Sequence, residues 1–461
     1  MIELSKTTIV APATGNGPAA IAVIRLSGPQ AFEIAQSVFE SPGGKQISDQ
    51  PGYTLLFGRI KDENTIIDEV LLSIFRAPHS YTGENVIEIS CHGSPFIRQE
   101  LLAVLQRRGA VPAAAGEFTL RAFLNGKMDL SQAEAVADLI ASENKSSHEL
   151  AMKQLRGGYS TKIRELRNSL MNFMALIELE LDFSTEDVEF ADRDHLRTLV
   201  LQISRVIEAL LQSFALGNAI KTGIPVTIAG KPNAGKSTLL NALMREERAI
   251  VSDIEGTTRD SIEDELVIDG YAFRLIDTAG LRETADTIET LGIERSYLKI
   301  KEADIILYLF DASGTQMHDL EQELSALRAE ANPESIIVAV GNKCDLPAAA
   351  GYEQKFGGLD HFVALSAMQG TGIGDLENKL VELVKNRRNS DTLVTNARHA
   401  EALRKSLNNL TSVLKGMDLH IPGDLLAADL REALSALSEI TGEVSNDEVL
   451  GVIFGKFCIG K

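Results

Sequence analysis

The spacing of hydrophobic and polar residues changes along this chain, and each pattern predicts a different kind of structure. In the first 125 residues, short apolar runs predict strands at 19–26, 69–75 and 86–90. The segment 94–108 has the spacing of an amphipathic helix, and turn residues such as Ser41-Pro42-Gly43-Gly44 separate the runs. We therefore expect a compact α/β domain at 1–125.

After residue 129 the apolar positions recur every three or four residues, which predicts long helices at 129–183 and 192–217. Ser131 and Glu134 have the spacing of a capping box at the start of the first helix. The same periodicity returns at 397–415 and 425–440.

The chain of 461 residues is long enough for several domains, but its last segment is marginal for a core of its own. We therefore expect residues 386–461 to pack on helices of 126–217 as one helical domain. Residues 218–385 would form an α/β domain inserted into it, since domain insertion is well tolerated. The predicted fold class is thus a multidomain protein with α/β and all-α parts.

Residues 230–237 read Gly-Lys-Pro-Asn-Ala-Gly-Lys-Ser, between an apolar run at 224–229 and a helix-compatible segment at 238–244. This strand–loop–helix context is what a phosphate-binding P-loop requires. Its backbone N–H groups and helix N-terminus would face an anion. Lys236 would reach the outer phosphates and Ser237 would bind Mg²⁺.

Further motifs follow in the order that a guanine-nucleotide fold requires. Thr258, in Thr257-Thr258-Arg259-Asp260, would add a second Mg²⁺ contact, and Asp277-Thr278-Ala279-Gly280 would hold the metal through water and sense the γ-phosphate. Asp345, in Asn342-Lys343-Cys344-Asp345, can accept two hydrogen bonds from guanine that adenine cannot offer. The expected GTP contacts are Asn233, Ala234, Gly235, Lys236, Ser237, Thr238, Ser252, Asp253, Ile254, Glu255, Gly256, Thr257, Thr258, Asp277, Thr278, Ala279, Gly280, Asn342, Lys343, Asp345, Ser366, Ala367 and Met368.

Leu281 stands where Ras-like enzymes carry the glutamine that orients the attacking water, so catalysis must come from other groups. Asn233 and the polar segment 252–257 could bind a monovalent cation such as K⁺ beside the phosphates. The segment 283–294 carries carboxylates, one of which could orient water; alternatively they form a solvated face. These are Glu283, Asp286, Glu289 and Glu294.

The net charge of −20, from 65 acidic against 45 basic residues, disfavours a protein that grips nucleic acid alone. A local basic patch could lie on one predicted helix, although the interleaved Glu165 favours a solvated face. Its members are Arg156, Lys162, Arg164 and Arg167. Any nucleic acid would then be held mainly by a partner protein.

The three cysteines lie far apart, which is not the spacing of a disulfide framework or a zinc site. Neither an apolar run of bilayer-spanning length nor an N-terminal leader is expected, so a cytoplasmic enzyme without membrane contact is predicted.

The chain as a whole resembles the MnmE (TrmE) family of bacterial tRNA uridine-modification GTPases. The resemblance rests on the order of domains, on Asp277-Thr278-Ala279-Gly280-Leu281 and on the terminal Phe457-Cys458-Ile459-Gly460-Lys461. It implies K⁺-dependent hydrolysis of GTP, with Mg²⁺ bound by Ser237 and Thr258 and with Glu289 orienting water. The implied K⁺ ligands are Asn233, Ser252, Ile254 and Thr257, where Ser252 replaces a threonine common in the family but keeps the hydroxyl.

The resemblance also implies that the N-terminal domain dimerises and binds 5-formyl- or methylene-tetrahydrofolate through Arg25, Glu88, Lys127 and Lys461. The family forms homodimers and a heterotetramer with the FAD- and NADH-dependent protein MnmG (GidA). Together they add an aminomethyl or carboxymethylaminomethyl group to carbon five of the tRNA wobble uridine. Cys458 could serve that chemistry as a functional thiol or simply pack against helices. A ribosome-assembly or signalling GTPase without a tRNA-modifying role is the alternative.

Overall fold

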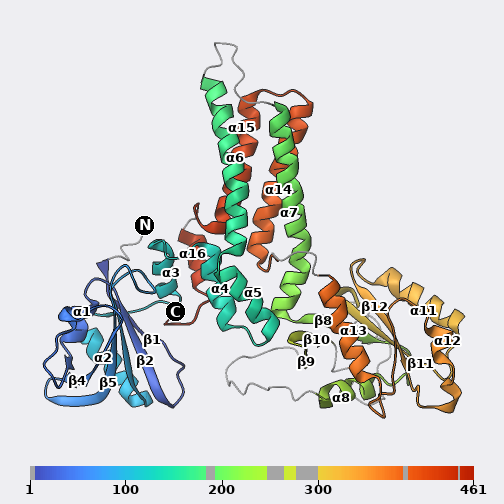
Figure 1. The fold of residues 1–461 in the computed structure, drawn as a ribbon, viewed down its shortest axis with the longest axis horizontal. Helices are drawn as coiled ribbons and strands as arrows, with labels where there is room; N and C mark the ends of the chain where they lie inside the picture. The colour runs from blue at the N-terminus through green and yellow to red at the C-terminus, as the bar shows by residue number, and fades with distance from the viewer. Residues whose placement is uncertain are drawn as a thin grey trace. The chain divides into compact units, whose positions relative to one another are not determined.

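The computed structural model describes residues 6–182, 193–246, 264–276, 300–387, 393–444 and 447–460. The chain divides into two compact units (Figure 1). Unit 1 comprises residues 1–140, 153–204 and 405–461, and unit 2 comprises 141–152 and 205–404.

Unit 1 begins with a seven-stranded sheet of order β3-β4-β5-β6-β2-β1-β7, which is antiparallel except for the β1–β7 pair. The strands are β1 (Ile9–Pro12), β2 (Ala19–Ser27), β3 (Phe39–Glu40), β4 (Thr54–Asp62), β5 (Thr65–Phe75), β6 (Val86–Gly93) and β7 (Val111–Pro112). The helices α1 (Ala31–Gln36) and α2 (Pro95–Arg107) pack apolar side chains on one face of this sheet. The strands predicted at 19–26, 69–75 and 86–90 and the helix predicted at 94–108 are confirmed, and the structure adds β1 and β4.

The opposite face of this sheet exposes large apolar side chains. Because side chains alternate along a strand, Leu55, Phe57 and Leu71 point away from α1 and α2 and are 59%, 53% and 41% exposed. Ile21 on β2 is 64% exposed. These four residues are called the open apolar face below.

The rest of unit 1 is helical. It contains α3 (Glu117–Leu124), α4 (Leu130–Ile140), α6 (Gly158–Asp182), α15 (Gly423–Thr441), α16 (Asp447–Phe454) and parts of α7 (Arg193–Thr222) and α14 (Ala397–Asp418). Arg167 on α6 donates to Ser438 on α15 at 2.7 Å, and Arg197 on α7 pairs with Asp418 on α14 at 2.6 Å. Segments far apart in sequence therefore form one bundle (Figure 1).

The helical region predicted at 129–183 is confirmed, and the structure divides it into α4, α5 (Lys145–Leu155) and α6. The break before α6 occurs at Gly157, whose φ of +80° is left-handed. The capping box differs from the prediction. Asp129 accepts a hydrogen bond from the Gln132 N–H at 2.9 Å, and its own N–H donates to Gln132 Oε1 at 3.0 Å. Ser131 lies inside α4 and bonds to Ser160.

Helix α7 is long and apolar enough to cross a membrane by length and composition alone, contrary to the sequence expectation. Such a property is also found in helices of soluble proteins, and Leu196, Val200 and Ile203 of α7 are buried within the protein.

Unit 2 is built around a six-stranded sheet of order β13-β12-β11-β8-β10-β9, parallel except for the β9–β10 pair. Its strands are β8 (Ile224–Ala229), β9 (Asp264–Ile268), β10 (Tyr271–Ile276), β11 (Ile305–Asp311), β12 (Ile336–Asn342) and β13 (Phe362–Ala364). Among the described residues, the helices that cover this sheet include α8 (Lys236–Glu246), α11 (Met317–Glu330), α12 (Tyr352–Phe356) and α13 (Ile373–Asn386). The predictions at 224–229 and 271–276 match β8 and β10 residue for residue.

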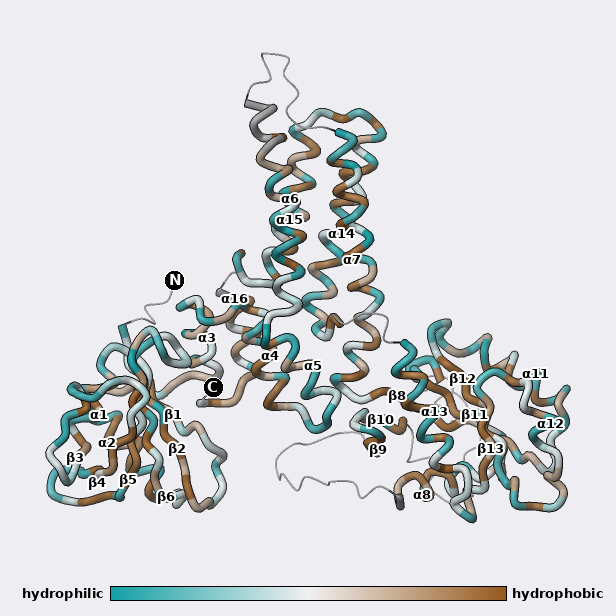
Figure 2. Tube along the Cα trace, in the orientation of Figure 1, coloured by the Kyte–Doolittle hydropathy of each residue, from teal (hydrophilic) through white to brown (hydrophobic). Residues whose placement is uncertain are grey.

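Alternate residues of β11 enter two different cores, which makes unit 2 a three-layer structure. Ile305, Leu307 and Leu309 pack in the core that includes α8 and α13, whereas Ile306 and Phe310 face α11 and α12. Hydrophobic residues accordingly concentrate along β11 and β12 (Figure 2). Because the parallel strands end at one edge, the loops after β8, β11, β12 and β13 meet there, where ligands bind in such sheets.

Candidate nucleotide-binding site

The loop after β8 requires glycine at two positions of its backbone. Gly230 and Gly235 have φ of +144° and +100°, which favour glycine. A Cβ at Gly230 would clash with the Leu309 carbonyl oxygen, and one at Gly235 would clash with the Asn342 side chain. The loop is therefore pressed against β11 and β12, and Asn233 within it is left-handed with φ +64°.

Lys236 is the first residue of α8 and folds back over this loop. Its ammonium donates to the carbonyl oxygens of Gly230 at 2.7 Å and Lys231 at 3.1 Å. Burial lowers the pKa of Lys236, because the charged form loses hydration. An anion such as phosphate would supply the opposite charge that stabilises this ammonium.

Asn342 joins two parts of the predicted site. It is 3% exposed, donates to the Ala234 carbonyl oxygen at 2.8 Å, and accepts from the Ala367 N–H at 3.0 Å. The P-loop and the loop 366–368 are thus tied to one side chain. The N–H groups of Ala367 and of Ser366, which donates to the Thr371 carbonyl, are already used. Of this triplet, the Met368 N–H alone has no hydrogen bond to another described residue, and Met368 is 89% exposed.

Lys343 and Asp345 each have a side-chain partner at the same edge. The Lys343 ammonium lies 2.6 Å from Asp311 Oδ2, and Asp345 accepts from the Gln369 amide at 3.3 Å. Asp311 also accepts from the N–H and hydroxyl of Ser313 at 2.9 and 2.6 Å. Burial alone would raise the pKa of Asp311, but the hydrogen bonds from Lys343 and Ser313 outweigh it and the pKa is lowered.

Several predicted contacts lie outside the described residues. They are Ser252, Asp253, Ile254, Glu255, Gly256, Thr257, Thr258, Asp277, Thr278, Ala279, Gly280, Leu281, Glu283, Asp286, Glu289, Glu294 and Lys461. Within the described residues, no three His, Cys, Asp or Glu side chains gather as a metal site would require.

A second predicted site lies on the sheet of unit 1, next to the open apolar face. Arg25 on β2 faces Glu88 on β6, and its guanidinium makes contacts of 2.7 and 2.8 Å to Glu88 Oε1. The guanidinium also lies 5.5 Å from the Tyr81 ring centre and 5.6 Å from that of Phe118. Lys127 donates to the Pro78 carbonyl at 3.0 Å, in the loop that carries Tyr81.

Comparisons with known proteins cover nearly the whole chain. A family model described as the MnmE helical domain matches residues 130–458, and one described as the GTP-binding protein TrmE N-terminus matches 8–127. A "tRNA modification GTPase MnmE" of Cytophaga hutchinsonii is 53% identical, over 98% of this chain and 98% of its own. The chain belongs to the MnmE family. Proteins of the same name from Flavobacterium psychrophilum and Bacteroides thetaiotaomicron are 51% and 50% identical, over 98% and 99% of this chain.

The C-terminal tail of this MnmE-family chain packs against the rest of unit 1. Ile459 bridges to Ala115, Phe457 is buried beside Phe454, and Gly460 has φ +99° where a Cβ would clash with the Pro12 carbonyl. Cys458 lies within this docked segment with an exposed side chain.

The basic patch suggested by the sequence is largely neutralised in this MnmE-family chain. Lys162 pairs with Glu165 at 3.4 Å, Arg167 with Glu443 at 2.8 Å, and Arg164 with Asp129. Three of the four basic side chains are therefore paired with carboxylates, which reduces the positive charge that this surface offers to nucleic acid.

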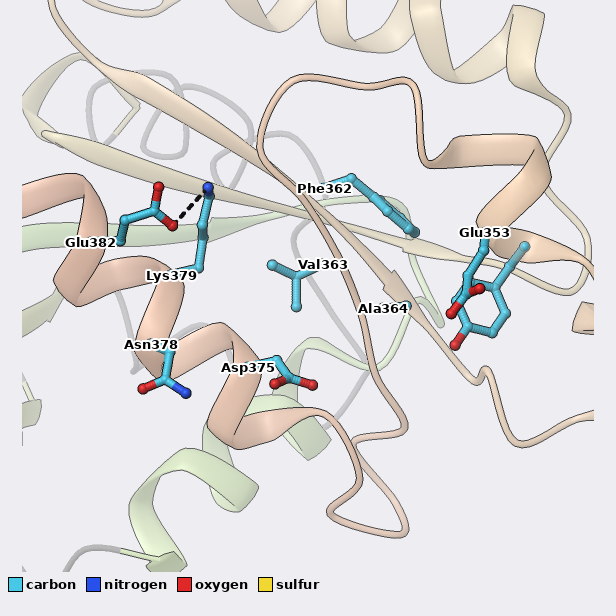
Figure 3. Close-up of a pocket in the computed structure, with 9 residues that line it drawn as sticks. Glu353, Phe362, Val363, Ala364, Asp375, Asn378, Lys379 and Glu382 are labelled. Carbon is cyan, nitrogen blue, oxygen red and sulfur yellow. Dashed lines mark hydrogen bonds and ion pairs between the residues drawn. The ribbon is translucent and has the colours of Figure 1, made fainter. Parts of the chain in front are cut away.

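One cavity of unit 2, about 410 Å³ in volume, shares no residue with the predicted nucleotide contacts. It lies between α12, the edge strand β13 and α13, with Glu353 on one side and Asp375 and Asn378 on the other (Figure 3). Lys379 in its wall is paired with Glu382 at 3.0 Å.

Three residues at the nucleotide site were missed by the sequence reasoning: Asp311, Gln369 and Glu323. Glu323 on α11 pairs with Lys231 of the P-loop. Asp311 had a usable signal, since it ends an apolar strand at the edge where ligands bind. Gln369 and Glu323 had none, because neither belongs to a local motif.

Proposed function

We propose that this protein hydrolyses GTP and works in tRNA modification. The observation that carries the proposal is the single buried side chain of Asn342, which ties the phosphate-binding loop to the loop beside the guanine-reading Asp345. A site whose parts are already joined loses little freedom when the nucleotide binds. The names of the relatives supply the tRNA part of the proposal.

The roles we propose follow the chemistry of each group. Lys236 neutralises the outer phosphates, and Ser237 with Thr258 binds Mg²⁺. Asp345 accepts from guanine N1–H and the exocyclic amine, and the Met368 N–H donates to the guanine oxygen.

Exchanging Asp345 for asparagine tests this reading of the base. Xanthine carries an oxygen where guanine carries the amine, so the amide of Asp345→Asn can donate to xanthine but repels guanine. We expect GTP turnover to fall at least about 100-fold and XTP turnover to rise above that of the wild type. Unchanged GTP turnover, measured as released phosphate, would contradict the proposed site.

We further propose that K⁺ bound by Asn233, Ser252, Ile254 and Thr257 supplies the charge that other GTPases obtain from arginine. Glu289 would orient the attacking water, because Leu281 cannot. The left-handed backbone of Asn233 is compatible with this role. Equal GTP turnover in KCl and NaCl would refute the role of K⁺. Unchanged GTP turnover of Glu289→Ala would refute the role of the glutamate.

Tetrahydrofolate is the proposed one-carbon carrier, bound as the 5-formyl or methylene form by Arg25, Glu88, Lys127 and Lys461. Supporting this, Glu88 is half-buried on a strand and Arg25 lies against two aromatic rings, a setting suited to a flat polar ring system. Undiminished folate binding by Glu88→Gln, in equilibrium dialysis, would argue against it.

The proposed partners are a second copy of this chain, tRNA and the FAD-dependent MnmG, acting together in the cytoplasm on carbon five of the wobble uridine. The open apolar face supports the homodimer, since four large exposed apolar side chains on one sheet need a cover. The charge of −20 supports a partner that carries much of the tRNA contact. We also propose the division 1–125, 126–217, 218–385 and 386–461, with the nucleotide domain inserted in the helical one; failure of isolated 218–385 to fold would count against it.

A further inference from the structure

Asp311 lies where a residue could act on the bound base without belonging to the expected motifs. It is the last residue of β11 and stands opposite Asn342, the last residue of β12, at the ligand-binding edge of the sheet. Its carboxylate accepts from Lys343 at 2.6 Å and from the hydroxyl and N–H of Ser313 at 2.6 and 2.9 Å. Three donors hold this carboxylate in one orientation.

Lys343, in turn, belongs to the segment 342–345 that is proposed to bind the base. It follows Asn342, comes two residues before Asp345, and has a left-handed backbone with φ +63°. A lysine side chain has four flexible bonds and normally loses much freedom when it is fixed. The ion pair with Asp311 restricts this one, at a side-chain exposure of 34% for Lys343.

We infer that Asp311 is a positioning residue for guanine binding: it holds the stem of Lys343 as a preformed wall of the base pocket. The inference rests on the proposed GTP site and adds to it a residue outside the expected motifs. A preformed wall lowers the entropy lost on binding. Its effect should therefore fall on nucleotide affinity and KM, and hardly on the rate of hydrolysis at saturation.

A purely structural role offers a competing explanation, since Asp311 also organises the turn 311–315 through Ser313 and through its own carbonyl, which accepts from Thr315. The two roles can be distinguished because they depend on different partners of Asp311. A turn role depends on Ser313, whereas a base-positioning role depends on Lys343.

The test is a double-mutant cycle on the full-length protein, titrated with a fluorescent methylanthraniloyl-GDP in buffer with Mg²⁺ and KCl. Asp311→Asn keeps an acceptor for Ser313 but loses the charge that holds Lys343. We expect its Kd to rise about tenfold, as for loss of one charge-assisted hydrogen bond. Lys343→Met should weaken binding at least as much, and adding Asp311→Asn to it should change Kd by less than about twofold.

Two controls accompany the cycle. Asp269→Asn breaks a comparable lysine–aspartate pair in the same unit, the 2.7 Å pair with Lys385, and should leave Kd and KM unchanged. Ser313→Ala should change Kd less than Asp311→Asn does, and saturating turnover of Asp311→Asn should stay near that of the wild type.

Two results would overturn the inference: an unchanged Kd for Asp311→Asn, or additive losses in the double mutant. If Ser313→Ala raised the Kd as much as Asp311→Asn does, Asp311 would be assigned to the turn, and this result would also overturn the inference. If the wild type itself failed to bind the nucleotide, the proposed function would fall, and the inference with it.

Discussion

At the scale of single residues, the geometry of the proposed nucleotide site depends on buried polar groups that have hydrogen-bond partners. Asn342 satisfies the Ala234 carbonyl and the Ala367 N–H at once. Removing it leaves both groups without that partner in a buried setting, which costs about 1–3 kcal/mol for each unsatisfied group.

Asn342→Ala should therefore lower the free energy of unfolding by about 2–6 kcal/mol and abolish measurable GDP binding. Urea unfolding and nucleotide titration measure the two effects. The control is Asn378→Ala on the exposed side of α13, which should change neither. GDP binding of Asn342→Ala at wild-type affinity would show that the two loops do not need this tie.

Local motifs allowed much of this site to be predicted from sequence, and contacts across the fold explain what was missed. The P-loop and the segment 342–345 can be recognised in the sequence because their residues are adjacent. Asp311 contacts a lysine 32 residues away, and Gln369 contacts a carboxylate 24 residues away. Only the parallel register of β11 and β12 brings the first pair together.

At the scale of elements, the clearest lesson comes from α4. The predicted capping box is Ser131 with Glu134, whereas the structure uses Asp129 with Gln132. Asp129 can do more than cap, because it also accepts from Ser160 and pairs with Arg164 on α6. Because Asp129 also contacts α6, tertiary contacts favour it as the cap of α4. The local spacing of residues does not reveal such contacts.

We expect Asp129→Ala to lower the free energy of unfolding by about 1–2 kcal/mol, because it removes the cap of α4 and a polar link to α6. Glu149→Ala, an exposed carboxylate on α5, is the control and should change it by less than about 0.5 kcal/mol. Equal unfolding midpoints for the two variants in urea would contradict the assigned cap.

The strands β8 and β10 were predicted more accurately than the helix ends after residue 129, for a physical reason. The strands β8 and β10 are short apolar runs that begin directly after glycine-containing turns, at Gly223 and Gly270. The helical stretch after residue 129 keeps one periodicity through three helices, so only the left-handed Gly157 marks the second break.

At the scale of the whole molecule, the open apolar face leaves large apolar side chains exposed to solvent in a monomer. Leu55, Phe57 and Leu71 lie on neighbouring strands with the Arg25–Glu88 pair further along the same face. A second copy of the chain would bury this surface and place it beside the proposed folate site.

Leu71→Asp should convert the proposed dimer to a monomer, since a charge would have to be buried in an apolar interface. Analytical ultracentrifugation at micromolar concentration measures the change. Leu346→Asp, at an exposed leucine of unit 2, is the matched control and should remain dimeric. A Leu71→Asp protein with unchanged mass would assign dimerisation to another surface.

The central claim is that GTP hydrolysis by this protein serves tRNA modification, and the nucleosides of cellular tRNA test it most directly. Cells lacking the gene receive either the wild type or Lys236→Ala, which loses the phosphate-binding ammonium. We expect mass spectrometry to find wobble uridines modified at carbon five only with the wild type. Full modification in cells that lack the gene would contradict the account.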